Sequence, residues 1–250
     1  MKVFEFVANC RSGHHSVLNW IILNKIGFQY DWKYKFVVLG DTGLSHLSEA
    51  NHDIHLSFQY IEENLNSTET LFVGYEDTEW NYTIFTDDNI YRGPQSFRDT
   101  KKYKMDYQNR VVLIRNFYSN LASRLKSNEN KMFGKWDSQS LHIFDTNEYY
   151  IQRWKSQARA CVENKVKFLR FEDWLKNKKV REDFLLDTFG LKDIHGIEDI
   201  EGTRSSFGER KKVLSRLDEV EIPEETKKLI REDSELHYLI GKIGYDYVKI

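Results

Sequence analysis

Residues 3–20 read VFEFVANCRSGHHSVLNW, and they carry the clearest structural signal in the chain. Val3 to Val7 form a short apolar run that is typical of a buried strand, and Asn9 to Gly13 form a small polar turn. From His14 onward the apolar residues recur at helical spacing, at Val17, Leu18, Ile21 and Ile22. A strand that turns directly into a helix leaves unpaired backbone N–H groups pointing at one place. That place favours an anion, because the helix dipole adds to the donors.

Arg11 places a permanent positive charge in this turn. The segment therefore predicts a site for a phosphate or a phosphosulfate. An ordinary strand–helix turn that carries a surface arginine explains the same residues, and this segment alone leaves both interpretations open.

A second segment, residues 111–126, reads VVLIRNFYSNLASRLK. Its first four residues again indicate a buried strand, Arg115 stands where that strand ends, and the residues from Tyr118 to Lys126 favour a helix. Ser123 lies eight positions after Arg115, about two helical turns further on. Since open α/β sheets bind ligands at the carboxyl ends of their strands, we expect Arg11 and Arg115 to share one edge of the sheet.

Together the two segments resemble the nucleotide-binding signature of the sulfotransferases that use 3′-phosphoadenosine 5′-phosphosulfate (PAPS). In that family an [RK]-S-G-[TS]-[TS] loop binds the 5′-phosphosulfate, and an Arg-x7-Ser element binds the 3′-phosphate. The matching residues here are Arg11, Ser12 and Gly13 for the first element, and Arg115 with Ser123 for the second.

Two later stretches extend the resemblance along the chain in the family's order. Residues 166–175 (VKFLRFEDWL) are similar to the family's late strand and its Tyr/Phe-Glu-Asp segment. Residues 202–212 (GTRSSFGERKK) are similar to the basic loop that closes over the nucleotide, and the resemblance implies nucleotide contacts there from Arg204, Ser205, Ser206 and Arg210.

The chain departs from the family pattern directly after Gly13, where His14 and His15 replace two hydroxyl residues and Ser16 restores a hydroxyl. Imidazole N–H groups also donate to phosphate, so we expect all three side chains to take part in binding. The two histidines leave the charge of this loop open.

The resemblance implies an α/β fold of the P-loop NTPase-like kind. It is a three-layer sandwich in which a mostly parallel central sheet has helices on both faces. The apolar patterns predict strands at 36–39, 70–75, 111–115 and 166–171, besides the first one. They predict helices at 54–65, 145–163, 179–189, 223–231 and 234–242. We expect one domain over residues 1–250, with an acceptor-side loop at 77–109 and a nucleotide-covering loop at 202–216.

Composition narrows the function classes. The formal net charge of −2 argues against a general nucleic-acid binder. With Cys10 and Cys161 as the two cysteines, the sequence implies no disulfide framework. The strand-like run begins at residue 3, and apolar runs fall short of the roughly 20 residues that cross a bilayer. We therefore expect a cytoplasmic protein without a signal peptide or a membrane span.

Sulfuryl transfer needs a base for the acceptor hydroxyl and positive charge at the departing phosphate. Arg11 is the candidate for the positive charge, since a guanidinium stabilises charge but hardly donates a proton, and His15 is the candidate acid. The candidate base is Glu76, at the end of the 70–75 strand, or else His14. A turn-capping role for Glu76 explains the sequence equally well.

Other features leave rival functions open. FVVLGD at 36–41 resembles a strand whose terminal aspartate holds Mg²⁺ in nucleotide kinases, but the chain lacks the G-x-x-x-x-G-K-[ST] loop. No strong metal-ligand spacing links His46, His52, Asp53 and His55, and no metal is expected. The sequence favours PAPS as co-substrate and a hydroxyl on a carbohydrate, lipid or small metabolite as acceptor. A P-loop nucleotide kinase and a non-catalytic nucleotide-binding module are the alternatives.

Overall fold

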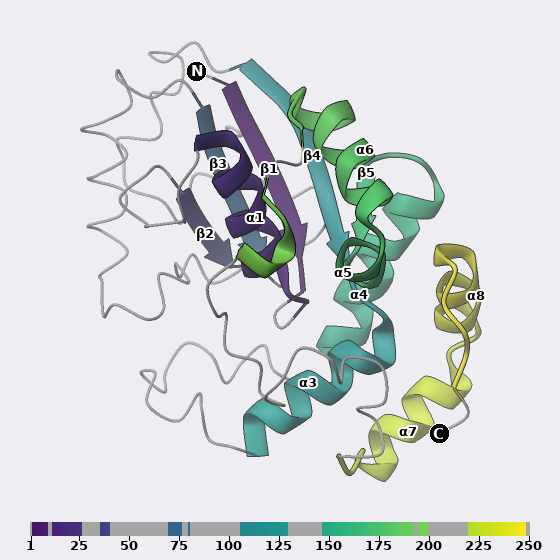
Figure 1. Cartoon of the computed structure of the whole chain (residues 1–250). Helices are drawn as coiled ribbons and strands as arrows, with labels where there is room; N and C mark the ends of the chain where they lie inside the picture. Colours follow the sequence, from purple (N-terminus) through teal and green to yellow (C-terminus); the bar gives the residue numbers. More distant parts are fainter. Residues whose placement is uncertain are drawn as a thin grey trace, which may run out of the picture.

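The centre of the computed structural model is a parallel sheet of five strands in the order β2-β3-β1-β4-β5 (Figure 1). The strands are β1 (Lys2–Ala8), β2 (Phe36–Gly40), β3 (Thr70–Glu76), β4 (Asp106–Ile114) and β5 (Lys167–Arg170). The structure describes residues 2–9, 12–26, 36–40, 70–76, 80, 106–129, 147–192, 195–199 and 220–248. In this strand order the segment 3–20 supplies the middle strand, β1.

Helices cover both faces of this sheet. They are α1 (His14–Ile26), α3 (Phe117–Glu129), α4 (Asn147–Val162), α5 (Phe171–Lys176), α6 (Lys178–Phe189), α7 (Glu224–Glu232) and α8 (Ser234–Ile243), with a short 3-10 turn at Ile197–Asp199. Side chains along β1 alternate between two cores, as expected for a strand that is covered on both faces. Phe4, Phe6 and Ala8 pack with α1, α5 and α6, whereas Val7 packs with α3, α4 and α8. The three-layer α/β fold predicted from the sequence is confirmed.

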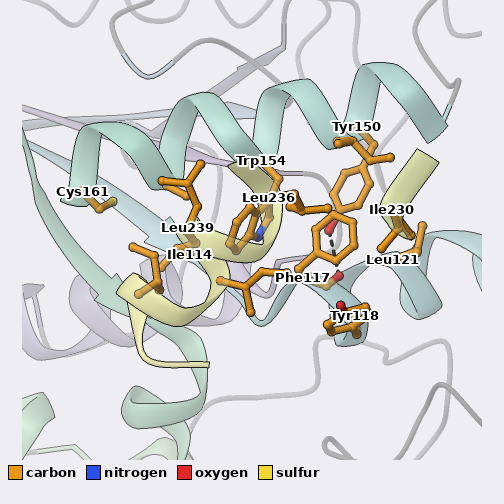
Figure 2. Close-up of a cluster of buried hydrophobic side chains, with 14 of the residues drawn as sticks. Ile114, Phe117, Tyr118, Leu121, Tyr150, Trp154, Cys161, Ile230, Leu236 and Leu239 are labelled. Atoms are coloured by element: carbon orange, nitrogen blue, oxygen red, sulfur yellow. Dashed lines mark hydrogen bonds between the residues drawn. The ribbon is translucent and has the colours of Figure 1, made fainter. Parts of the chain in front are cut away.

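One of the two cores is rich in aromatic side chains from α3 and α4 (Figure 2). Phe117 stacks on Tyr150 with ring centroids 5.3 Å apart and meets the edge of Trp154 at 5.5 Å. The Tyr150 hydroxyl donates to the Phe117 carbonyl oxygen at 2.9 Å. Burial of such rings contributes most of the packing energy of a core, so α3 is fixed firmly on α4 just beyond the end of β4.

The strand register brings several chain segments to one edge of the sheet. Ala8, the last residue of β1, lies opposite Glu76, the last residue of β3, and opposite Leu113 near the end of β4. Ile114 in turn lies opposite Arg170, the last residue of β5. The turn after β1, the end of β3 and the starts of α3 and α5 therefore lie along this carboxyl edge.

Most predicted elements agree with the structure to within one or two residues, with two corrections. β4 begins at Asp106, so residues 106–109 of the predicted loop 77–109 belong to the sheet. This polar stretch pairs in parallel with the start of β1, and Arg110, directly after it, pairs with the buried Glu5 of β1 at 2.6 Å. The predicted strand 166–171 ends at Arg170, because Phe171 begins α5, which the sequence reasoning missed.

Other predictions lie outside the described residues: the helix 54–65, the loop 202–216, and the loop 77–109 apart from residues 80 and 106–109. Within the part of the chain that the structure describes, no helix combines the length and the apolar character that crossing a membrane requires.

Candidate functional site

The turn after β1 leads directly into α1. The Ser12 backbone N–H donates to the Asn9 carbonyl oxygen at 3.0 Å, and the N–H groups of Ser16 and Val17 donate to the Gly13 carbonyl oxygen at 3.1 and 3.3 Å. Ser12 is buried, and its hydroxyl finds no hydrogen-bond partner among the described residues. A buried polar group of this kind favours a bound ligand that supplies the missing bond. Arg11, which the sequence predicts to be central here, lies outside the described residues.

Gly13 is required at its position for two reasons. Its φ of +87° lies in the left-handed region that side-chain-bearing residues rarely adopt. In addition, a Cβ atom built on Gly13 would lie 2.3 Å from a ring carbon of Phe171. Phe171, the first residue of α5, therefore packs directly against the backbone of the turn after β1, which is called the first turn below.

Arg115 also contacts the ring of Phe171. It follows β4 directly, it is buried with 5% of its surface exposed, and its guanidinium carbon lies 5.3 Å from the centre of the Phe171 ring. That distance is within the range of a cation–π contact. Phe171 thus contacts both predicted phosphate-binding segments, Gly13 in one and Arg115 in the other.

The backbone around Arg115 is fixed by side chains from other elements. Trp154 on α4 donates its indole N–H to the Arg115 carbonyl oxygen at 3.0 Å. The Asn116 N–H donates to the Glu172 carboxylate at 3.2 Å, and the Asn116 side chain accepts from the Ser119 N–H at 3.0 Å, which caps α3. Ser123 lies further along α3 and is buried.

The remaining predicted residues are placed only in part. His14 begins α1 and is buried, Ser16 is half-buried, and the side chain of His15 lies outside the described residues. The side chain of Glu76 also lies outside them, although its backbone ends β3 opposite Ala8. Two further groups of residues also lie outside the described part of the chain. They are the predicted loop residues Arg204, Ser205, Ser206 and Arg210, and the possible metal ligands His46, His52, Asp53 and His55.

Sequence reasoning missed two helical residues that shape this edge. Gln157, fully buried on α4, accepts a hydrogen bond at 3.0 Å from the side-chain amide of Asn9, the residue after β1. Trp154 lies one helical turn earlier on α4. A polar residue on the apolar face of a predicted helix is the signal that identifies Gln157. Nothing in the sequence connects Trp154 with the carbonyl oxygen of Arg115, to which its indole N–H donates.

Among the residues that the structure describes, no group of three or more His, Cys, Asp or Glu side chains is arranged so that it could hold a metal ion.

The fold is a three-layer α/β fold with a strand–turn–helix at the middle of a parallel sheet. Among solved structures, the chain is similar to a mouse sulfotransferase, SULT7A1, complexed with PAP, at 12% identity and a TM-score of 0.49. The alignment covers 96% of this chain and 89% of that one. No family model matches the chain, and no curated protein matches it.

Proposed function

We propose that this protein is a sulfotransferase, formed by one domain over residues 1–250, that transfers a sulfuryl group from PAPS to an acceptor hydroxyl. The observation that carries the proposal is the position of Phe171, which packs on Gly13 and lies beneath the Arg115 guanidinium. A nucleotide with phosphate groups on both its 3′ and 5′ oxygens needs two anion sites, and Phe171 contacts both candidates. The first turn and Arg115 are suited to be those two sites.

The residues fit the two ends of the nucleotide differently. At the 5′ end, the backbone N–H groups at the start of α1, the buried Ser12 hydroxyl and Arg11 would bind the phosphosulfate, joined by His14, His15 and Ser16. At the 3′ end, Arg115 and Ser123 would bind the phosphate. Arg204, Ser205, Ser206 and Arg210 would cover the nucleotide.

The reaction forms a bond between the acceptor oxygen and sulfur and breaks the bond between sulfur and the bridging phosphate oxygen. The hydroxyl proton passes to a base, for which Glu76 is the first candidate and His14 the second. The register of β3 with β1 supports Glu76, because it puts this residue at the carboxyl edge beside the first turn. Arg11 would stabilise the charge on the departing oxygen, with His15 as the acid. A carbohydrate, lipid or small metabolite would supply the acceptor hydroxyl.

Calorimetry with adenosine 3′,5′-bisphosphate and with 5′-AMP tests the nucleotide site. Replacing Arg115 by Ala should weaken binding of the bisphosphate by about 1.5–3 kcal/mol, the range for hydrogen bonds to charged groups, and should leave 5′-AMP binding unchanged. Arg181→Ala is the matched control, since Arg181 is also buried, with 7% exposed, but donates to the Trp174 carbonyl oxygen on another helix. Equal affinity of the unmodified protein for both nucleotides would refute the proposal.

Turnover separates the proposed enzyme from its rivals. We expect sulfate transfer to at least one member of a broad panel of hydroxyl acceptors. A larger rise in melting temperature with ATP and Mg²⁺ than with the bisphosphate would favour a kinase. Tight binding of the bisphosphate without transfer to any acceptor would favour a non-catalytic module.

A further inference from the structure

Glu172 is a buried carboxylate with an uncommon set of partners. Only 7% of the residue is exposed, and the carboxylate accepts from the Asn116 backbone N–H at 3.2 Å and from the Tyr245 hydroxyl at 2.7 Å. None of the ion pairs in the described part of the chain includes Glu172, and the neighbouring Arg170 pairs with Asp173. A buried carboxylate without a cation depends on its hydrogen-bond donors, so each donor is held firmly in place.

Arg170, two residues before Glu172, holds the segment after α8 (residues 244–248) in place. Arg170 donates to the carbonyl oxygens of Ile243 and Gly244 at 3.1 and 3.0 Å, and its guanidinium carbon lies 5.6 Å from the centre of the Tyr245 ring. The Tyr245 backbone N–H donates to the Ile240 carbonyl oxygen at 3.0 Å. The ring therefore has little freedom, and its hydroxyl is directed at Glu172.

Burial, and then the nearby charge of Glu172, raise the pKa of the Tyr245 hydroxyl far above its ordinary value. The hydroxyl consequently remains a donor at neutral and alkaline pH. The path from the segment after α8 to the predicted 3′-phosphate site is short: Tyr245 donates to Glu172, Glu172 accepts from Asn116, and Asn116 follows Arg115 in the chain.

We propose that Glu172 and Tyr245 are positioning residues for Arg115, so that the segment after α8 sets how strongly the site prefers a 3′,5′-bisphosphate over a 5′-monophosphate nucleotide. This inference rests on the proposed function, since it assigns Arg115 to the 3′-phosphate. Glu172 and Tyr245 act by fixing the backbone from which the guanidinium extends, in concert with Trp154 on the carbonyl side.

The test is the ratio of the dissociation constants for 5′-AMP and adenosine 3′,5′-bisphosphate in the Tyr245→Phe variant. We expect this preference to fall roughly 3- to 10-fold, the equivalent of one net hydrogen bond, with 5′-AMP affinity unchanged. Tyr150→Phe is the matched control, because it deletes a buried hydroxyl that donates to Phe117 at 2.9 Å, and it should leave the preference intact. Glu172→Gln, which replaces one acceptor oxygen by a donor, should lower the preference as well.

A second background distinguishes positioning from general loosening. In an Arg115→Ala protein, adding Tyr245→Phe should not change the preference further, because the group being positioned is gone. An unmodified protein that prefers neither nucleotide would overturn the proposed function. An unmodified protein with a clear preference that both Tyr245→Phe and Glu172→Gln retain would overturn the positioning role alone.

Discussion

Replacing Gly13 by Ala should lower the free energy of unfolding through two separate effects, and the size of each can be estimated from the structure. The first is conformational, because φ is +87° at this residue, and a side-chain-bearing residue in the left-handed region costs about 1–2 kcal/mol. The second is steric, because the new Cβ would meet three carbon atoms of the Phe171 ring at 2.3, 2.7 and 2.8 Å. Overpacking of this kind costs about 1–3 kcal/mol, so the free energy of unfolding should fall by about 2–5 kcal/mol in all.

Gly190→Ala isolates the first effect. Gly190 also has a positive φ, +67°, but nothing lies within 4 Å of the position that its Cβ would take. We therefore expect this variant to lose only the conformational part, about 1–2 kcal/mol, in urea unfolding followed by circular dichroism. The difference between the variants measures the contact with Phe171, and Phe171→Leu should recover part of it in the Gly13→Ala background. Equal losses in the two glycine variants would refute the close packing of Phe171 on the first turn.

Three further predictions concern helices α4 and α8. Gly241→Ala, at an exposed helical position with open space around its Cβ, should raise the free energy of unfolding by about 0.5–1 kcal/mol in the same urea assay. Hydrogen bonds, the first from Lys155, lower the pKa of Glu235 below its ordinary value of 4.5, so their stabilisation is present above that pH and is lost as the pH falls. Glu235→Gln should therefore reduce the loss of melting temperature on acidification below about pH 4.5. Burial raises the pKa of the Cys161 thiol from 9.0 to about 12, so peptide mass spectrometry should show alkylation at pH 8 in urea and almost none in the folded protein.

Much of the fold could be predicted because its signals are local. The run from Val3 to Val7 and the helical spacing after His14 mark β1 and α1 without reference to the rest of the chain. Gly190 marks the end of α6 for a similar reason, since a glycine with positive φ is a common helix terminator. Local backbone preference and apolar periodicity agree at these places, which is why the predicted boundaries lie close to the observed ones.

The misses have a different physical origin. Residues 106–109 are too polar to suggest a strand, and they form one by pairing with the start of β1, more than a hundred positions earlier in the chain. Helix α5 has only six residues, too few to display a periodicity, and its first residue is an aromatic one that favours a strand. The first case depends on a pairing between distant residues, which a single sequence does not display, and the second on a helix too short to leave a pattern.

The candidate site follows the same division. Residue types and spacing select Gly13 and Arg115, but the sequence presents Phe171, which contacts both, only as part of a segment that resembles the family. Its role depends on the packing of α5 across the ends of two strands. The predictions that rest on Arg11 and on the loop 202–216 remain predictions.

At the junction of β5 and α5, the successive residues Arg170, Phe171 and Glu172 contact three different segments of the chain. Successive residues of a helix point about 100° apart, so one turn that starts at a strand end directs its side chains to different neighbours. Arg170 donates to the carbonyl oxygen of Gly244 just after α8, Phe171 packs on Gly13, and Glu172 accepts from Asn116. The start of α5 is thereby in contact with three segments that are far apart in the chain. A displacement of this one turn would move all three together, whereas a change in any one of them meets resistance from the other two. Coupling between the first turn, Arg115 and the segment after α8 is therefore expected from geometry, without any large conformational change.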